Sequence, residues 1–522
     1  MNRVRQAYER IRQVDRPEIW IDLRPESDVL SEFASASGPL AGKLLAVKGN
    51  IDVAGLPTTA GCPDYAYQPS ADAPVVARLR ALGAVVLGTT NMDQFATGLV
   101  GTRSPYGAVR CAVDPSRVSG GSSAGSAVAV ALGIADLALG TDTAGSGRVP
   151  AAFNGIVGLK PTRGLLSISG VVPACRSIDC VSIFARTAPE ASFALSCLTS
   201  EPLGGPPALP YRLGVPVELG PLAPGWDAAF SAASHRFAGA SLVPVDISPF
   251  LAAARLLYEG AFVAERYSAV GSFISAHPDS VDPTVRSIIS SAASLPAWQL
   301  FDDFAALESL KLAADEVMSS VDALLLPTTT SHPTLAEVAA DPVGVNSGLG
   351  RFTNFANLLD YAALAIPAGS VDGLPFGVSL IGPAHSDHRL SAIASFFGDT
   401  RKIAVVGAHL SGQPLNHELV SRGAVLVSST KTASAYRLFA LDTSPPKPGL
   451  VRAGDGAAVE AEVWELPVSA FGSFVAGVPA PMAIGKVELA DGTWVPGFTC
   501  EPFAVSGAQD ITSYGGWRAF LS

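Results

Sequence analysis

Charged residues are scarce in this sequence, and basic residues are scarcer than acidic ones. Only 16% of the 522 residues are charged, and the formal net charge at pH 7 is −11. This balance argues against a nucleic-acid-binding protein or a protein that lies on an acidic membrane, and an anionic small substrate would need a local cationic contact. Hydrophobic residues make up 48% of the chain, which is typical of globular proteins with large cores and excludes a disordered or fibrous chain.

Cysteine is also sparse and forms no recognisable pattern. The six cysteines include no Cys-x-x-Cys pair and no spacing with histidine that is typical of a metal site. We therefore expect reduced thiols in a cytoplasmic protein and no metal. Residues 1–9 are polar and show no signal peptide, and no apolar run reaches membrane-spanning length. The sequence predicts no membrane association.

The chain is long for a single core and indicates two or more domains. A strand around Ala46, a helix over residues 73–82 and a strand over residues 84–88 alternate along the first part. This alternation predicts a layered α/β fold, a mixed sheet with helices on both faces. Proline and glycine are frequent in residues 200–225, which indicates a surface connection.

The character of the sequence changes near residue 400. Apolar strands over residues 322–328, 364–369 and 375–382 complete the first domain, which we place at residues 1–398. From there the chain becomes β-rich with tight turns. Residues 402–522 are therefore expected to form a small second domain.

Two clusters of glycine and serine stand out in the first domain. One, at residues 120–126, opens an apolar helical run, and the other, at residues 141–147, follows an apolar strand at residues 135–139. Glycines let backbone N–H groups turn toward one point, and a serine among them can be a nucleophile facing its own oxyanion hole. Taken separately, each cluster is also explained as a flexible loop without chemistry.

A nucleophilic serine needs a base, and none of the seven histidines lies in this stretch. Lys48 is the nearest unusual candidate, because it lies inside an otherwise apolar, strand-like run over residues 44–53. Burial disfavours the ammonium form, so such a lysine can be neutral enough to accept a proton. The alternative for Lys48 alone is a salt-bridged lysine or one whose amine reaches solvent.

Together these features resemble the amidase signature hydrolases. Lys48, the Gly-Gly-Ser-Ser run that contains Ser122 and the Gly-Thr-Asp-Thr run that leads to Ser146 have that family's order and separations. The resemblance implies that Ser146 is the nucleophile, Ser122 the bridging serine and Lys48 the terminal base. Lys48 would take a proton from Ser122, which takes one from Ser146 as its Oγ attacks an amide carbonyl.

The same resemblance implies an oxyanion hole made of backbone N–H groups, those of Thr143, Ala144, Gly145 and Ser146. Because these groups meet the charge that develops on oxygen, no metal or organic cofactor is expected. Ala124 and Ala144 stand where many family members carry glycine. One added methyl group forbids little unless φ is positive there, so the proton relay is still expected.

Residues 257–267 predict one helix in which Tyr258 and Arg266 lie on the same side, roughly 12 Å apart along the axis. The segment is similar to the allophanate hydrolase branch of the family, in which this tyrosine and arginine bind the substrate's carboxylate end. Arg266 would then make a charge-assisted contact and Tyr258 a hydroxyl contact. Alternatively, Arg266 pairs with Glu259 or Glu265 on a solvated face and Tyr258 packs.

Residues 341–350 and 353–360 are similar to the same branch. Within them, Asn346 and Ser347 are candidate polar contacts to the substrate, although a loop asparagine is more often a turn residue. Asp93 follows a strand end, where it lies near the site or caps the next helix.

The second domain resembles the C-terminal domain of allophanate hydrolases, which is similar in fold to gamma-glutamylcyclotransferase-like barrels. The run from Gly407 to Leu410 and the following Pro414 to Asn416 carry this resemblance. A histidine is implicated there in decarboxylation; His409 is the better candidate and His417 the poorer one. A lone histidine is more often structural than catalytic.

The resemblance as a whole implies hydrolysis of the small molecule allophanate to ammonia and N-carboxycarbamate, which the second domain helps to decarboxylate to carbon dioxide and ammonia. A homodimer is expected, together with a functional link to urea carboxylase. Two alternatives are an amidase of other specificity, including an A-type amidotransferase subunit, and a non-catalytic scaffold with the same fold.

Overall fold

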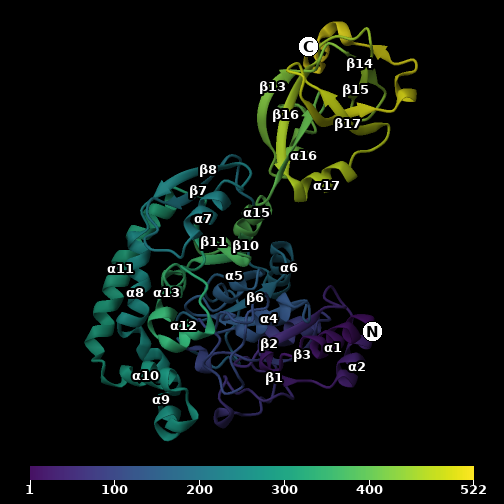
Figure 1. Ribbon diagram of the computed structural model, residues 1–522. Coiled ribbons are helices and arrows are strands. Elements are labelled where there is room, and N and C mark those ends of the chain that lie inside the picture. The colour runs from purple at the N-terminus through teal and green to yellow at the C-terminus, as the bar shows by residue number, and fades with distance from the viewer. The chain divides into compact units, whose positions relative to one another are not determined.

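The computed structural model describes residues 1–522, the side chain of Ser469 excepted, and divides into two compact units (Figure 1). The first unit contains Met1–Pro206, Arg212–Ser234 and Leu242–Ala394. The second contains Ser395–Ser522 together with two short upstream segments, Pro207–Tyr211 and His235–Ser241.

An eleven-stranded mixed sheet organises the first unit. In spatial order its strands are β1 (Trp20–Leu23), β3 (Val85–Thr90), β2 (Leu44–Lys48), β4 (Leu137–Asp142), β6 (Cys180–Ala185), β5 (Val157–Lys160), β10 (Ala362–Val371), β11 (Leu374–Gly382), β9 (Ala323–Pro327), β7 (Tyr211–Pro216) and β8 (Ala240–Val245). β2 pairs in parallel with β3 and β4, whereas β4 to β6 and β10 to β11 pair antiparallel. The predicted mixed α/β sheet is confirmed.

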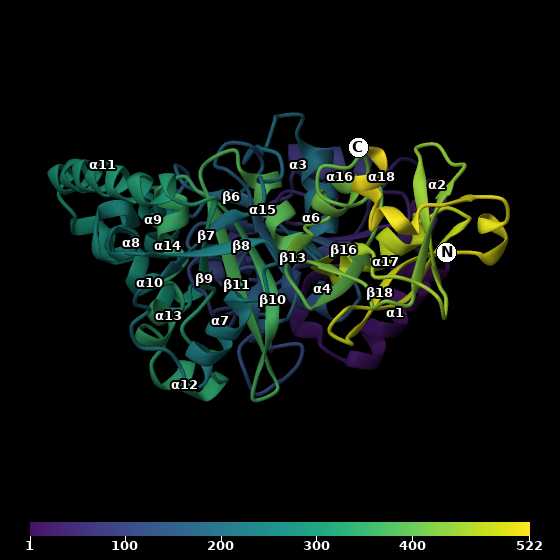
Figure 2. The same cartoon turned by 90° about the horizontal axis from the view of Figure 1, so that it is seen from above.

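Helices cover both faces of this sheet (Figure 2). The helices of this part are α1 (Asn2–Val14), α2 (Glu26–Ser35), α3 (Pro74–Ala81), α4 (Ala124–Ala131), α5 (Val149–Phe153), α6 (Ala188–Leu198), α7 (Trp226–Ser234), α8 (Ser248–Glu259), α9 (Ala264–Ala276), α10 (Pro283–Ser290), α11 (Ala297–Ser319), α12 (Leu335–Ala340), α13 (Gly344–Leu349), α14 (Asn354–Leu358) and α15 (Asp387–Ser395). Among the described residues, no helix combines the length and apolarity needed to span a bilayer.

The packing of the core of this unit determines where the first glycine and serine cluster lies. Every residue of β2 is buried, since the strand lies between two others and its side chains are covered on both faces. α4 is built of alanine, valine, glycine and serine, and its small side chains let it pack directly against the sheet. Its first residue follows Ser123, so the serine pair sits where the chain enters the helix.

One sequence prediction about this unit is wrong in part. Residues 200–225 contain β7, which pairs in parallel with β9 and is not merely a surface connection. The flanking prolines and glycines mark the connection correctly, but Leu213 and Gly214 are held by a partner strand more than one hundred positions away. Such long-range pairing overrides local composition.

The second unit is β-rich, as expected. A five-stranded sheet consists, in spatial order, of β13 (Val425–Lys431), β16 (Glu460–Pro467), β12 (Thr400–Val405), β18 (Trp494–Cys500) and β17 (Met482–Glu488). A three-stranded sheet consists of β15 (Lys447–Arg452), β14 (Tyr436–Leu441) and β19 (Gln509–Asp510). The helices are α16 (Asn416–Val420), α17 (Val468–Ala476) and α18 (Trp517–Leu521). Both sheets contribute side chains to one hydrophobic core.

Candidate active site

Lys48, Ser122 and Ser146 form one buried hydrogen-bonded chain. Lys48, the last residue of β2, donates from Nζ to Ser122 Oγ at 2.8 Å and to Thr141 Oγ1 at 2.7 Å. Ser122 Oγ in turn donates to Ser146 Oγ at 3.0 Å. The peptide bond between Gly121 and Ser122 is cis. The structure therefore brings the three sequence-predicted residues within direct proton-transfer distance.

The environment of Lys48 favours its neutral form. The side chain is fully buried, and burial lowers the pKa of Lys48 to about 7, against the opposing charges of Asp93, Asp179 and Asp142. Among the described residues none forms a salt bridge with Lys48, which rules out the salt-bridged alternative, and its complete burial rules out the solvent-reaching one. An amine with this pKa is substantially neutral near pH 7 and can accept a proton.

The loop before Ser146 presents three of the four expected oxyanion donors. The Gly145 N–H donates to Asp142 Oδ1 at 2.9 Å and is thereby occupied, which revises the expectation for that residue. The N–H groups of Thr143, Ala144 and Ser146 donate to no acceptor in the part of the chain that the structure describes. These three groups therefore stay available to a developing oxyanion.

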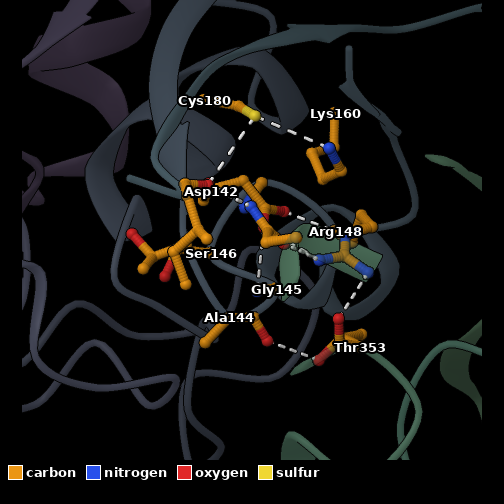
Figure 3. A network of polar contacts seen from close by, with 12 residues as sticks. Asp142, Ala144, Gly145, Ser146, Arg148, Lys160, Cys180 and Thr353 are labelled. Carbon is orange, nitrogen blue, oxygen red and sulfur yellow. Dashed lines mark hydrogen bonds and ion pairs between the residues drawn. The ribbon is translucent and has the colours of Figure 1, made fainter. Parts of the chain in front are cut away.

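A buried ion pair holds this loop in place, as Figure 3 shows. Arg148 donates from Nε and Nη2 to the two carboxylate oxygens of Asp142 at 2.9 and 2.8 Å, and both side chains are inaccessible to solvent. Thr353, which precedes α14, accepts from Arg148 Nη1 and donates from Oγ1 to Ala144 O at 2.6 Å. Gly145 has φ of 126°, and a Cβ there would lie 2.4 Å from Thr353 Oγ1.

These supporting residues were missed by sequence reasoning. Asp142 and Arg148 flank the nucleophile loop, and Thr353 lies in a segment noted only for its resemblance to the allophanate hydrolase branch. The sequence did contain one signal for the first two: Asp142 and Arg148 carry opposite charges at the two ends of a glycine-rich loop. Nothing in the sequence alone places Thr353 against Ala144, because the two are 209 positions apart.

Replacing Thr353 by valine is expected to lower kcat about 10- to 100-fold with little change in KM. The substitution keeps the side-chain volume but removes the hydrogen bond that fixes the Ala144 carbonyl, so the oxyanion donors lose their alignment. Steady-state kinetics on the purified variant measures the effect. Thr353→Ser keeps the hydroxyl and should retain most of the activity; an equally impaired serine variant would show that packing, not the hydroxyl, matters.

Tyr258 and Arg266 meet, although not on one continuous helix. The predicted helix over residues 257–267 is wrong: α8 ends at Glu259, Gly260 is extended, and α9 begins at Ala264 after a short 3-10 turn. The break still brings Arg266 Nη2 to 3.2 Å from the Tyr258 hydroxyl.

Arg266 is a buried cation without a carboxylate partner. Its side chain is 1% exposed, and its Nη1 donates to Thr97 Oγ1 at 3.1 Å and to Ala96 O at 3.3 Å. Glu265 instead accepts from the amide and hydroxyl of Ser177, and no ion pair of Arg266 exists among the described residues. The alternative in which Arg266 pairs with a glutamate on a solvated face is therefore wrong.

The remaining residues that the sequence suggested for the site, Asn346, Ser347 and Asp93, lie in different environments. Asn346 and Ser347 belong to α13 and not to a turn, and Asn346 Oδ1 accepts from the Leu99 amide at 2.7 Å. Ser347 and Tyr258 both line a pocket of about 390 Å³. Asp93 accepts from the Gly101 and Arg103 amides without a side-chain capping bond, and its charge acts on Lys48.

In the second unit, His409 lines a separate pocket of about 170 Å³. Its ring stacks on Phe498 with the ring centroids 4.7 Å apart, and its Nε2 lies 3.3 Å from Glu418 Oε2. Burial lowers the pKa of His409, so the imidazole is neutral near pH 7. His417 is exposed, and its Nδ1 lies 2.9 Å from the Pro414 carbonyl oxygen. Of the two candidate histidines, His409 therefore lies in a pocket and His417 lies on the surface.

The fold and the buried lysine with its two serines are those of an amide hydrolase. A model of the amidase family matches residues 23–390, and the chain belongs to this family. Residues 401–522 match the model described as the allophanate hydrolase C-terminal domain.

Solved structures and curated relatives agree with this assignment. The allophanate hydrolase of Kluyveromyces lactis is similar at 41% identity with a TM-score of 0.71, covering 100% of this chain and 96% of that one. The urea amidolyase of the same organism is similar at 41% identity and a TM-score of 0.73, with 100% of this chain and 36% of that one covered. The urea amidolyase of Lachancea kluyveri is 44% identical over 96% of this chain, which spans only 31% of that relative's length.

Proposed function

We propose that this chain is an allophanate hydrolase. The observation that carries the proposal is the buried, carboxylate-free Arg266 beside the hydrogen-bonded Lys48, Ser122 and Ser146. Arg266 is close enough for its charge to act on the pKa of Lys48. Allophanate has a cleavable terminal amide at one end and a carboxylate at the other, which matches a nucleophile at one side of a site and a guanidinium at the other.

In the proposed reaction, neutral Lys48 takes a proton from Ser122 while Ser122 takes one from Ser146. Ser146 Oγ then attacks the terminal amide carbon, and the N–H groups of the loop receive the oxyanion. The relay returns a proton to the leaving nitrogen, which departs as ammonia. Water, deprotonated by the same relay, cleaves the acyl-enzyme and leaves N-carboxycarbamate.

Arg266 and Tyr258 bind the substrate carboxylate in this proposal. The guanidinium is desolvated and already oriented by Thr97 and Tyr258, so little entropy is lost when an anion arrives. Ser347, on the wall of the same pocket as Tyr258, and Asn346, through the Leu99 amide, shape this end.

Replacing Arg266 by glutamine is expected to raise KM for allophanate roughly 100-fold, because a desolvated charge-assisted contact is lost. Biuret is the matched neutral substrate, since it carries an amide where allophanate carries the carboxylate. Its KM should change less than about 3-fold, as no ion pair is removed. Steady-state ammonia release from both substrates, with Arg266→Lys as the charge-keeping control, measures the difference. Equal losses on both substrates would remove Arg266 from carboxylate binding.

We propose that the second unit assists the decarboxylation of N-carboxycarbamate, with His409 as the histidine that contacts the substrate. The C–N bond to one carboxylate breaks, its electron pair stays on nitrogen, and nitrogen takes a proton from water as carbon dioxide leaves. The remaining carbamate then breaks down to ammonia and a second carbon dioxide. We also propose that the second unit is similar in fold to gamma-glutamylcyclotransferase-like barrels.

A homodimer and a functional link to urea carboxylase are further proposals. α11 exposes the large apolar side chains Trp298, Phe301 and Leu312, which a two-fold contact with a second copy would cover. Because allophanate is carboxylated urea, an enzyme that carboxylates urea would supply it. The much longer relatives named urea amidolyase support a connection of this kind.

A further inference from the structure

The pocket of His409 is small and largely apolar. Its volume of about 170 Å³ is below the usual range for drug-sized ligands, so it suits a small metabolite. Val405, Val478, Met482 and Phe498 supply apolar walls. An anion that enters such a pocket loses its hydration and needs compensating charge or hydrogen bonds.

Lys447 provides that charge. Among the described residues that line the pocket, it alone carries a permanent positive charge. Lys447 begins β15 and is half-buried, and no carboxylate of the described chain lies within ion-pair distance of it. It is near enough to His409 for its charge to help burial lower the pKa of that histidine. Lys447 therefore lines the pocket without an ion pair of its own among the described residues.

The loop that follows β12 adds hydrogen-bond donors. The amides of Gly407, Ala408 and His409 donate to no acceptor elsewhere in the described residues, although all three residues line the pocket. Successive free N–H groups of this kind form anion-binding concavities. A Cβ on Gly407 would lie 2.3 Å from the ring of Pro448, so glycine lets this loop lie against the residue next to Lys447. The loop with these donors therefore lies against Pro448, the residue that follows Lys447.

The orientation of His409 leaves one ring nitrogen for a ligand. A carboxylate only accepts, so the contact to Glu418 requires the proton on Nε2. Nδ1 then carries the lone pair. Stacking on Phe498 keeps the ring in this orientation.

We infer that this pocket binds a small dicarboxylate, and that Lys447 with the amides of residues 407–409 holds one of its carboxylates while the other faces the apolar wall. The inference rests on the proposed function, because N-carboxycarbamate is the dicarboxylate that the first reaction forms. A carboxylate held by an ammonium keeps its charge and stays on the product. The carboxylate against the apolar wall is destabilised by desolvation and is the one that leaves as carbon dioxide. Lys447 is thus a substrate-binding residue that holds the carboxylate that stays on the product.

Lys447→Met tests this inference in the full chain. With ¹³C-labelled allophanate followed by NMR, we expect the first ammonia to appear at the wild-type rate while N-carboxycarbamate decays about 10- to 100-fold more slowly. Lys486→Met is the matched control, because Lys486 lies on β17 in the same unit, is exposed and is outside the pocket. Decay at the wild-type rate in Lys447→Met, or equal slowing in Lys486→Met, would overturn the inference.

A binding measurement separates this inference from the first reaction. Malonate is a dicarboxylate of the same length, and calorimetric titration of the Arg266→Gln chain reports the second site, since the proposed anion contact of the first unit has been removed. Adding Lys447→Met to that chain should weaken malonate binding about 10- to 100-fold, and adding Lys486→Met should not. If the wild type released no ammonia from allophanate, the proposed function would be wrong. The titration would still show whether the pocket of His409 binds a dicarboxylate. Absence of malonate binding to the Arg266→Gln chain would contradict the inference directly.

Discussion

The Ser146→Ala variant is expected to release ammonia from allophanate at least about 10⁴-fold more slowly than the wild-type chain. Without Oγ there is no atom that can form the acyl-enzyme, and residual turnover would come only from binding and the oxyanion donors. Ser146 is 2% exposed and its Oγ accepts a hydrogen bond from Ser122, so the substitution removes one buried polar atom from a tightly packed loop. Continuous measurement of ammonia gives the rate.

The variant must remain folded for this result to report chemistry. Thermal unfolding should be nearly unchanged, because Arg148, Asp142 and Thr353 keep holding the loop. Binding of malonate to the first unit should also survive, since Arg266 is untouched. Ammonia release within about 10-fold of the wild type would exclude Ser146 as the nucleophile.

The Lys48→Met variant should lose about 10²- to 10⁴-fold in kcat/KM, the usual contribution of a positioned base. Methionine fills a similar volume in the apolar end of β2 but cannot accept a proton. The hydrogen bonds to Ser122 and Thr141 disappear with the amine, so the relay has no terminus. A loss of less than about 3-fold would assign the base to another group.

The pH dependence provides a second readout of Lys48. Burial lowers the pKa of Lys48 to about 7, and only the neutral amine accepts a proton. In the wild type kcat/KM should therefore rise as pH increases through about 7 and then level off. This limb should vanish in Lys48→Met, whereas an unchanged limb in the variant would attribute it to a different titrating group.

Local patterns predicted the strands and helices that carry the site, because the relevant signals are short. The apolar run that contains Lys48 and the apolar helical run that the first glycine and serine cluster opens can be read directly, and the structure has β2 at Leu44–Lys48 and α4 at Ala124–Ala131 there. The strand over residues 135–139 was displaced: β4 begins at Leu137 and extends to Asp142, since pairing with β6 continues into the polar residues. The break at Gly260 was missed because helical periodicity continues across it.

The site itself was only partly accessible from the sequence. Lys48, Ser122 and Ser146 are separated along the chain. The family resemblance, and not their spacing alone, predicted that they act together. The occupied amide of Gly145 and the Thr353 hydroxyl on Ala144 depend on side chains brought from distant elements. The placement of Lys447 beside His409 likewise required the two sheets of the second unit to pack, which local patterns do not encode.

Ammonia release by the purified chain from fresh allophanate, compared with malonamate, acetamide and glutamine, tests the central claim most directly. Ser146→Ala serves as the control for each substrate. The account predicts a strong preference for allophanate that disappears in the variant. Faster turnover of the neutral amides would contradict it: the chemistry of Lys48, Ser122 and Ser146 would stand, but the carboxylate-binding role of Arg266 would fall.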